Sequence, residues 1–234
     1  MKKLLIIDSR MRDVEKNKLI DLGYQLIKIE RNNNIYEEIS SHVDIFACKV
    51  GKNIIVEPSQ YGKFIQNDIF IKGQNEVKSK YPDDIKYNVC IIGKKAIHYL
   101  NYTDEILKQE LIKNKYELID TVQGYTNCSI AVIDDNSAIV TDKGLFKILK
   151  AHGIDVLFIQ EDLDIKLFTG NKYSDKKGFI GGCISRIGNK VIVFGDLSRI
   201  DEKQEIRKFI NKKGLEIIEF KGIDVIDYGG IIEV

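Results

Sequence analysis

Five side chains of the kinds that enzymes use for catalysis or polar binding fall at the starts of predicted strands: Cys183, His42, Asp44, Asn88 and Ser129. A thiolate is a nucleophile, an imidazole moves protons near neutral pH, and a carboxylate binds cations or orients an imidazole. In an extended strand, side chains two positions apart share a face. We therefore expect His42 and Asp44 to face one way, and all five side chains to converge if the strand starts surround a common axis.

The cysteine spacing bears on metals and on redox state. Neighbouring cysteines are about 40 to 55 residues apart, with no CxxC and no nearby Cys/His pair. This spacing fits neither a disulfide-rich scaffold nor a zinc site, so we expect reduced thiols, no metal and no cofactor. Cys48 and Cys90 occupy a small-residue position of a repeat and are predicted to be packing residues. Cys128 adjoins Ser129, so strand alternation turns it to the opposite face and predicts a core position.

A repeat of strand, tight turn, strand, helix and strand organises the chain. Copies begin near residues 42, 87, 128 and 182, and alternating apolar residues mark the strands. Equivalent turn residues recur 42, 41 and 54 positions apart, at Gly51, Gly93, Asp134 and Gly188. The longest spacing contains an insertion at residues 161–180, which is either a lid over a site or a long surface loop.

The two ends of the chain complete the repeat. Residues 3–30 supply a strand, a helix and a strand, while the tail, residues 227–234, is a lone strand. Pairing the tail with the first unit closes a ring and removes exposed sheet edges. We therefore predict an α/β fold, a five-bladed α/β propeller of ββαβ units with five-fold pseudosymmetry, in one domain spanning residues 1–234.

Charge and hydropathy exclude several classes of partner. Thirty-six basic and 35 acidic residues give a net charge of +1, which predicts neither a nucleic-acid nor a membrane-surface partner. The first apolar run, Leu4 to Ile7, stops at Asp8, too early for a signal peptide. No run approaches the eighteen or so apolar residues of a membrane span. We expect a cytoplasmic protein, and its oligomeric state is not indicated by the sequence.

Five ββαβ units with both termini in one blade resemble the pentein fold of the guanidino-group-modifying enzymes. That superfamily includes arginine deiminase, agmatine deiminase, dimethylargininase and the amidinotransferases, together with a non-enzymatic ribosome anti-association factor. Locally, residues 42–44 match the family's HxD, and Gly-Gly runs precede two strands. Segments 42–44, 123–129 and 179–182 together are similar to an uncharacterised bacterial branch of the superfamily.

The resemblance implies a small polar substrate of the guanidino or amidino type. Such a cation needs carboxylates to bind it and a thiolate to attack its central carbon. By resemblance, Cys183 would be the nucleophile, His42 the general acid–base, and Asp44 the group that orients His42 or binds the substrate. The remaining expected site residues, which would bind substrate or allow close backbone approach, are Asn88, Ser129, Tyr125, Gly181 and Gly182.

The chain also departs from the family pattern. In the hydrolases the nucleophilic cysteine lies in the chain-ending strand, where this sequence has Ile231, and the HxD falls later in the chain. It remains open that the catalytic residues lie on a different pair of blades around the pseudosymmetry axis. Three functions therefore stay in contention: a cysteine-dependent hydrolase or transferase, a catalytically silent protein that binds a small metabolite, and one that binds a macromolecular partner.

Overall fold

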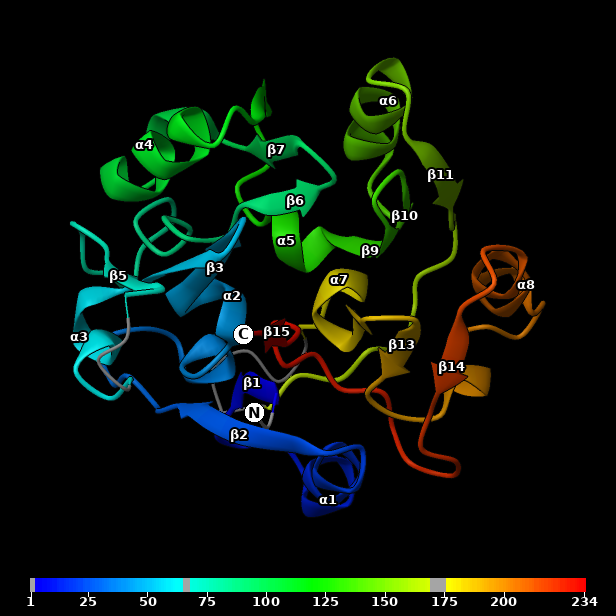
Figure 1. Cartoon of the computed structure of the whole chain (residues 1–234). Helices are drawn as coiled ribbons and strands as arrows, with labels where there is room; N and C mark the ends of the chain where they lie inside the picture. The colour runs from blue at the N-terminus through cyan, green and yellow to red at the C-terminus, as the bar shows by residue number, and fades with distance from the viewer. Residues whose placement is uncertain (1–2, 65–67, 169–175) are drawn as a thin grey trace.

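The computed structural model describes residues 3–64, 68–168 and 176–234, and within these ranges five small three-stranded sheets surround a central axis (Figure 1). Each sheet repeats one plan, in which an inner strand pairs antiparallel with a middle strand and the middle strand pairs parallel with an outer one. The inner strands are β3 (Ala47–Val50), β6 (Cys90–Ile92), β9 (Ile130–Asp134), β12 (Ile184–Ile187) and β15 (Ile232–Glu233).

The middle and outer strands of each sheet are joined through a helix, because parallel neighbours need a crossover connection. The middle strands are β1 (Lys3–Asp8), β4 (Asn53–Val56), β7 (Lys95–His98), β10 (Ser137–Val140) and β13 (Lys190–Val193). The outer strands are β2 (Tyr24–Ile29), β5 (Phe70–Lys72), β8 (Glu117–Asp120), β11 (Asp155–Phe158) and β14 (Glu216–Ile218). The connecting helices are α1 (Asp13–Asp21), α3 (Pro58–Tyr61), α4 (Glu105–Lys113), α6 (Lys143–Ala151) and α8 (Glu205–Lys212).

Amphipathic helices cover the outside of the ring (Figure 1). Their buried residues recur four apart: Leu107 and Leu111 in α4, and Leu145 and Leu149 in α6. Positions i and i+4 lie on one helix face, so α4 and α6 each present an apolar stripe to the interior. No helix within the described ranges combines the length and apolar character needed to cross a membrane.

Tight turns join the inner and middle strands, as the repeat predicts. Gly51, Gly93 and Gly188 have φ angles of 61°, 56° and 57°, a left-handed conformation that glycine adopts without steric cost. In the fourth unit, β9 ends at Asp134 and the chain turns through the next two residues. The repeat alignment based on these four turn residues is therefore confirmed.

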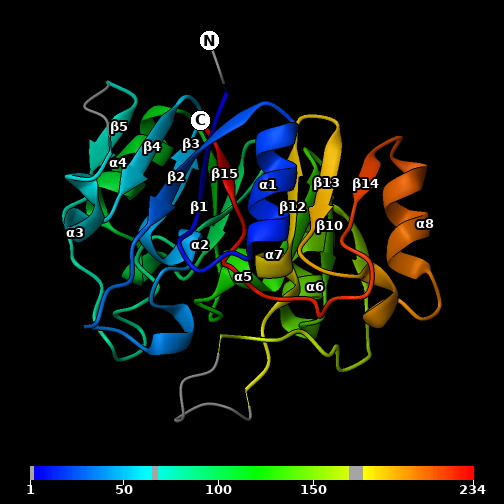
Figure 2. The ribbon, with the colours of Figure 1, turned by 90° about the horizontal axis from the view of Figure 1, so that it is seen from below.

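The tail closes the ring. β15 pairs antiparallel with β1, with Leu5 opposite Glu233 and Ile6 opposite Ile232. The first sheet consequently contains strands from both ends of the chain, and Figure 2 shows β1 and β15 side by side. The predicted five-bladed α/β propeller is confirmed.

The starts of the inner strands differ from the sequence expectation. Single helical turns precede three of them: α2 (Val43–Phe46), α5 (Thr126–Ser129) and α7 (Ile180–Cys183). A helix turns the side chain by about 100° per residue, whereas an extended strand alternates by 180°. The expectation that His42 and Asp44 share one face of an extended strand is therefore wrong.

Three short 3-10 helices complete the elements: η1 (Glu37–Ile39), η2 (Leu100–Tyr102) and η3 (Leu197–Arg199). The insertion at residues 161–180 is described except for 169–175, so the lid-or-loop alternative lies partly outside the described residues. Its first part bridges to the tail, where Lys166 pairs with Ile226. Its last part returns to the same place, because the amide of Gly178 donates to the carbonyl of Ile165 at 2.9 Å.

Candidate functional site

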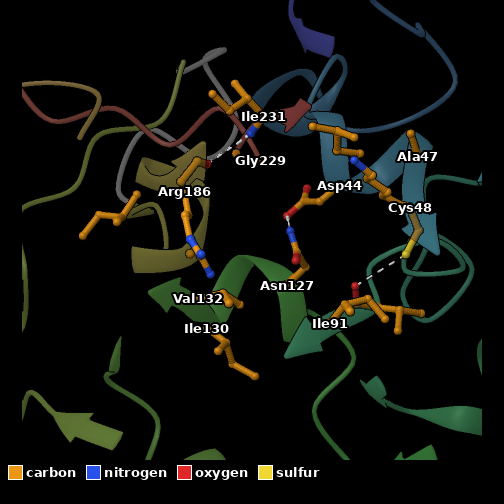
Figure 3. A pocket seen from close by; sticks show the side chains of 17 residues that line it. Asp44, Ala47, Cys48, Ile91, Asn127, Ile130, Val132, Arg186, Gly229 and Ile231 are labelled. Atoms are coloured by element: carbon orange, nitrogen blue, oxygen red, sulfur yellow. Dashed lines mark hydrogen bonds between the residues drawn. The ribbon is translucent and has the colours of Figure 1, made fainter. Parts of the chain in front are cut away.

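An axial cavity of about 200 Å³ lies inside the ring of inner strands (Figure 3). Each of the five units contributes to its wall, through segments 47–49, 89–91, 130–132, 184–186 and 231–232. Asp44 from α2 and Asn127 from α5 also line this cavity, and Figure 3 shows their side chains pointing toward one another. The bond between them is a hydrogen bond of 3.3 Å from Asn127 Nδ2 to Asp44 Oδ2.

A second cavity, which we call the aromatic pocket, has a volume of about 360 Å³. Its wall comes from η1, the N-terminal end of α2, the loop at Tyr81, α5, the segment before α7 and the start of the tail. Its lining residues are Tyr36, Glu38, Ile39, His42, Tyr81, Tyr125, Cys128, Leu167, Lys176, Lys177, Phe179 and Asp227. A concave site with an apolar wall and a few polar groups is the usual form of a small-molecule site.

Cys128 and Asp44 join the two cavities. Cys128 lines the aromatic pocket and Asp44 lines the axial cavity, yet Cys128 Sγ donates to Asp44 Oδ2 at 2.9 Å. Asn88 holds the thiol from the other side, since its Nδ2 donates to Sγ at 3.0 Å. The Oδ1 of Asn88 accepts from the backbone amides of Asn127 at 2.9 Å and Cys128 at 3.3 Å. The amide of Asn88 thereby fixes both the thiol and the start of α5.

Burial favours the protonated forms of both Cys128 and Asp44. Burial raises the pKa of Asp44 to about 6, although hydrogen bonds from Cys128 and Asn127 oppose the shift. Burial, followed by the negative charges of Asp44 and Asp227, raises the pKa of the Cys128 thiol well above its ordinary value. These effects favour the protonated thiol, and a cation beside it would favour its ionisation by offsetting the negative charges.

His42 and Asp227 form a second polar pair in the aromatic pocket. Both are fully buried, and His42 Nδ1 lies 3.6 Å from Asp227 Oδ1. Neither ring nitrogen of His42 has a hydrogen-bond partner in the protein, although buried polar atoms normally have one. Burial lowers the pKa of His42, and the charge of Asp227 opposes that effect. A neutral imidazole beside a carboxylate can accept or relay a proton.

Backbone amides fix the carboxylate of Asp227. Its Oδ2 accepts from the amide of Phe179 and its Oδ1 accepts from the amide of Gly229, each at 2.8 Å. Burial raises the pKa of Asp227, while His42 lowers it. The carboxylate beside the expected histidine is thus Asp227, not Asp44, which contacts Cys128 instead.

The structure brings together four of the residues singled out from the sequence. His42 and Tyr125 line the aromatic pocket, Asp44 lies behind it, and Asn88 bonds to Cys128. Ser129 ends α5 with its hydroxyl buried and without a hydrogen-bond partner, and it lines neither cavity.

Cys183 does not join this group. Its side chain is fully buried in an apolar cluster, its Sγ donates to the carbonyl of Ile180 at 3.4 Å, and it lines neither of the two cavities. The helical turn of α7 explains this placement, since it is not an extended strand with alternating faces. The same helical geometry in α5 directs Cys128, and not its neighbour Ser129, toward Asp44.

Gly181 and Gly182 permit close approach, but the approaching groups belong to the protein. A Cβ on Gly181 would lie 2.1 Å from the carbonyl oxygen of Asn127, and a Cβ on Gly182 would lie 1.7 Å from Asp227 Oδ1. Their small size therefore lets α7 pack against α5 and against the carboxylate that faces His42.

Sequence reasoning missed three of the site residues, Cys128, Asp227 and Glu38. Cys128 was expected in the core, and Asp227 was noted only as the start of the tail. One available signal for Asp227 was its place a few residues before an inner strand, since Asp44 and Cys128 also lie shortly before theirs. No group of three or more His, Cys, Asp or Glu within the described ranges is arranged to hold a metal ion.

Solved structures with this architecture define the class. DDAH from Pseudomonas aeruginosa in complex with citrulline has 10% identity and a TM-score of 0.53, covering 96% of this chain and 92% of its own. Inosamine-phosphate amidinotransferase from Streptomyces griseus has 13% identity and a TM-score of 0.52, covering 93% and 75%. Agmatine deiminase from C. jejuni has 14% identity and a TM-score of 0.52, covering 94% and 75%. The protein has the pentein fold.

Within this class, the chain belongs to a family of unknown function, DUF6873, which matches residues 6–232. No curated protein sequence matches it. At 10–14% identity the structural likeness shows the fold alone, so any chemistry has to be argued from the site.

Proposed function

We propose that the protein is a thiol-dependent hydrolase or transferase acting on a small guanidino or amidino compound, with Cys128 as its nucleophile. Cys128 takes the role that the sequence suggested for Cys183. His42 handles protons on the substrate nitrogen and on water, Asp227 orients His42, and Asp44 receives the thiol proton. The substrate class comes from the named relatives with this fold, and the residues come from the aromatic pocket.

One observation carries the proposal. A thiol, an unpartnered imidazole and a carboxylate line a single pocket, and the thiol already donates to a second carboxylate at 2.9 Å. Nucleophile, proton acceptor and proton relay are the groups that a covalent displacement at a planar carbon requires.

In the first half of the reaction, Cys128 Sγ bonds to the central carbon of the guanidinium and the bond from that carbon to the leaving nitrogen breaks. Asp44 takes up the thiol proton, and a proton returned to the leaving nitrogen lets it depart as a neutral amine. The product bound to the enzyme is a cationic S-amidino cysteine, beside Asp227.

In the second half, water adds to the same carbon and the carbon–sulfur bond breaks. One water proton restores the thiol, the other is released to the free amine or to solvent, and a urea leaves. A transferase would use an amine in place of water and release an exchanged guanidine.

Turnover by matched cysteine variants tests the assignment. A set of guanidino and amidino compounds is incubated with the wild type, Cys128→Ser and Cys183→Ser, and released amine, ammonia and urea are quantified. We expect Cys128→Ser to lose activity by a factor on the order of 10³ or more, while Cys183→Ser keeps it. Activity that survives in Cys128→Ser and disappears in a folded Cys183→Ser would return the nucleophile to Cys183.

The raised pKa of the Cys128 thiol favours a second function, which is binding without turnover. The raised pKa of Cys128 keeps the thiol protonated, which suits a binding protein that carries the same small cations without turnover. Ligand-dependent stabilisation without product formation would identify this case. The proposal keeps a cytoplasmic location, consistent with four free cysteines, and a macromolecular partner remains the least supported alternative.

A further inference from the structure

Three aromatic rings form one wall of the aromatic pocket. The ring centroids of Tyr81 and Tyr125 are 5.7 Å apart, and those of Tyr125 and Phe179 are 6.1 Å apart with nearly parallel planes. The Tyr125 hydroxyl donates to Asp84, which fixes the middle ring. Phe179 is 39% exposed and Tyr81 is 46% exposed, so the wall continues from the buried interior to the protein surface. Large exposed aromatic side chains at the mouth of a cavity mark a ligand contact.

Acidic groups occupy the inner part of the same pocket. Glu38 is buried and its Oε1 has no hydrogen-bond partner, while Asp227 faces His42. Two buried carboxylates favour a cation and disfavour a second negative charge. A buried carboxylate oxygen without a partner also suits the several N–H donors of a guanidinium or amidinium.

Two lysines, Lys176 and Lys177, line the pocket, and Lys177 and the nearby Arg10 have carboxylate or carbonyl partners of their own. Lys177 Nζ is held by Asp162 at 2.6 Å. Arg10, whose charge reaches His42, is held by Asp8 at 2.8 Å and by the carbonyl oxygens of Glu37 and Glu38. A ligand carboxylate would therefore have to compete with these partners.

We propose that the aromatic pocket selects guanidines or amidines with an apolar alkyl or aryl substituent and without a carboxylate. This inference rests on the proposed function and names its substrate class. The cationic head binds between Glu38 and Asp227, beside Cys128, and the substituent lies along Tyr81, Tyr125 and Phe179.

Binding to a protein that cannot turn over separates this inference from catalysis. Calorimetric titration of the Cys128→Ala protein with guanidine, ethylguanidine, butylguanidine and arginine compares substituents on one head group. Butylguanidine is arginine without its ammonium and carboxylate. We expect affinity to rise about threefold to fourfold per buried methylene, and butylguanidine to bind at least tenfold more tightly than arginine.

Two variants assign the affinity to the proposed contacts. Phe179→Ala should lower the affinity for butylguanidine at least fivefold and leave the affinity for guanidine within twofold of the wild-type value, because only the substituent contacts the ring. Glu38→Gln should weaken every cation in the series. Val122→Ala is the control, since Val122 is 86% exposed and does not line the pocket.

Three outcomes separate the proposals. Affinity that rises with chain length and depends on Phe179 supports the apolar substrate class. Arginine binding as tightly as butylguanidine, or tighter, overturns that class and leaves the proposed function standing. Failure of every guanidine to bind a folded Cys128→Ala protein overturns both.

Discussion

Cys128 Sγ lies 2.9 Å from Asp44 Oδ2, although the two residues are 84 positions apart in the sequence and line different cavities. The contact places the thiol of one pocket against a carboxylate that belongs to the axial cavity. It depends on two helical turns, α2 and α5, which present these side chains toward one another at the centre of the ring. A buried thiol and a buried carboxylate in contact share one proton, and this shared proton is the chemical core of the proposed site.

The charge on Asp44 should make stability depend on pH. Because the pKa is raised in the folded protein, the contribution of Asp44 to stability is fully present below its ordinary pKa and is lost as pH rises through about 6. Asp44→Asn removes this loss. Relative to the wild type, the variant should gain about 2–3 kcal/mol in unfolding free energy between pH 4 and pH 7. Urea unfolding across this range measures the difference, and a difference that does not change with pH would contradict the assignment.

His98 should produce the opposite dependence. It is fully buried with Nδ1 2.7 Å from the hydroxyl of Thr103, and burial lowers its pKa to about 4. A lowered histidine pKa gives stability that is present above the ordinary value and lost as pH falls toward 4. The wild type should therefore lose about 3 kcal/mol more than His98→Gln between pH 7 and pH 4. Urea unfolding measures the losses, and equal losses in the two proteins would show that burial does not lower the pKa of His98.

Packing around Gly182 should not tolerate a methyl group. A Cβ at this position would collide with the carboxylate of Asp227, which backbone amides hold in place. We expect Gly182→Ala to cost at least about 3 kcal/mol of unfolding free energy. Gly62→Ala is the matched control, because nothing lies within 4 Å of a Cβ there, and it should be nearly neutral. If both variants unfold at the same denaturant concentration as the wild type, Asp227 is not fixed against α7.

The sequence was sufficient for the fold because local signals and global topology agree. Tight turns recur in four of the five units, three of them at a glycine, alternating apolar residues mark the strands, and the lone tail strand has a single place to pair. The site was only partly predictable. His42, Asp44, Asn88 and Tyr125 were identified because polar residues at strand starts are informative in a ring.

The placement of Cys128, the proposed nucleophile, could not be predicted from strand alternation. Four-residue helical turns leave little periodicity in the sequence, and inserting one changes which neighbour faces the axis. For this reason Cys128, and not Ser129, faces Asp44. The carboxylate beside His42 is likewise Asp227 and not the expected Asp44. Asp227 reaches His42 only through the fold of the tail, which joins residues far apart in the chain.

Affinity labelling tests the central claim, that the pocket places a cationic carbon next to Cys128. Chloroacetamidine and chloroacetamide differ mainly in charge at neutral pH, and both alkylate thiols. Each is incubated with the native protein, and peptide mass spectrometry gives the rate at every cysteine. We predict that chloroacetamidine modifies Cys128 at least tenfold faster than chloroacetamide does, that Glu38→Gln removes most of this preference, and that Cys183 stays unmodified. Equal rates for the two reagents at Cys128, or faster modification of Cys183, would contradict the account.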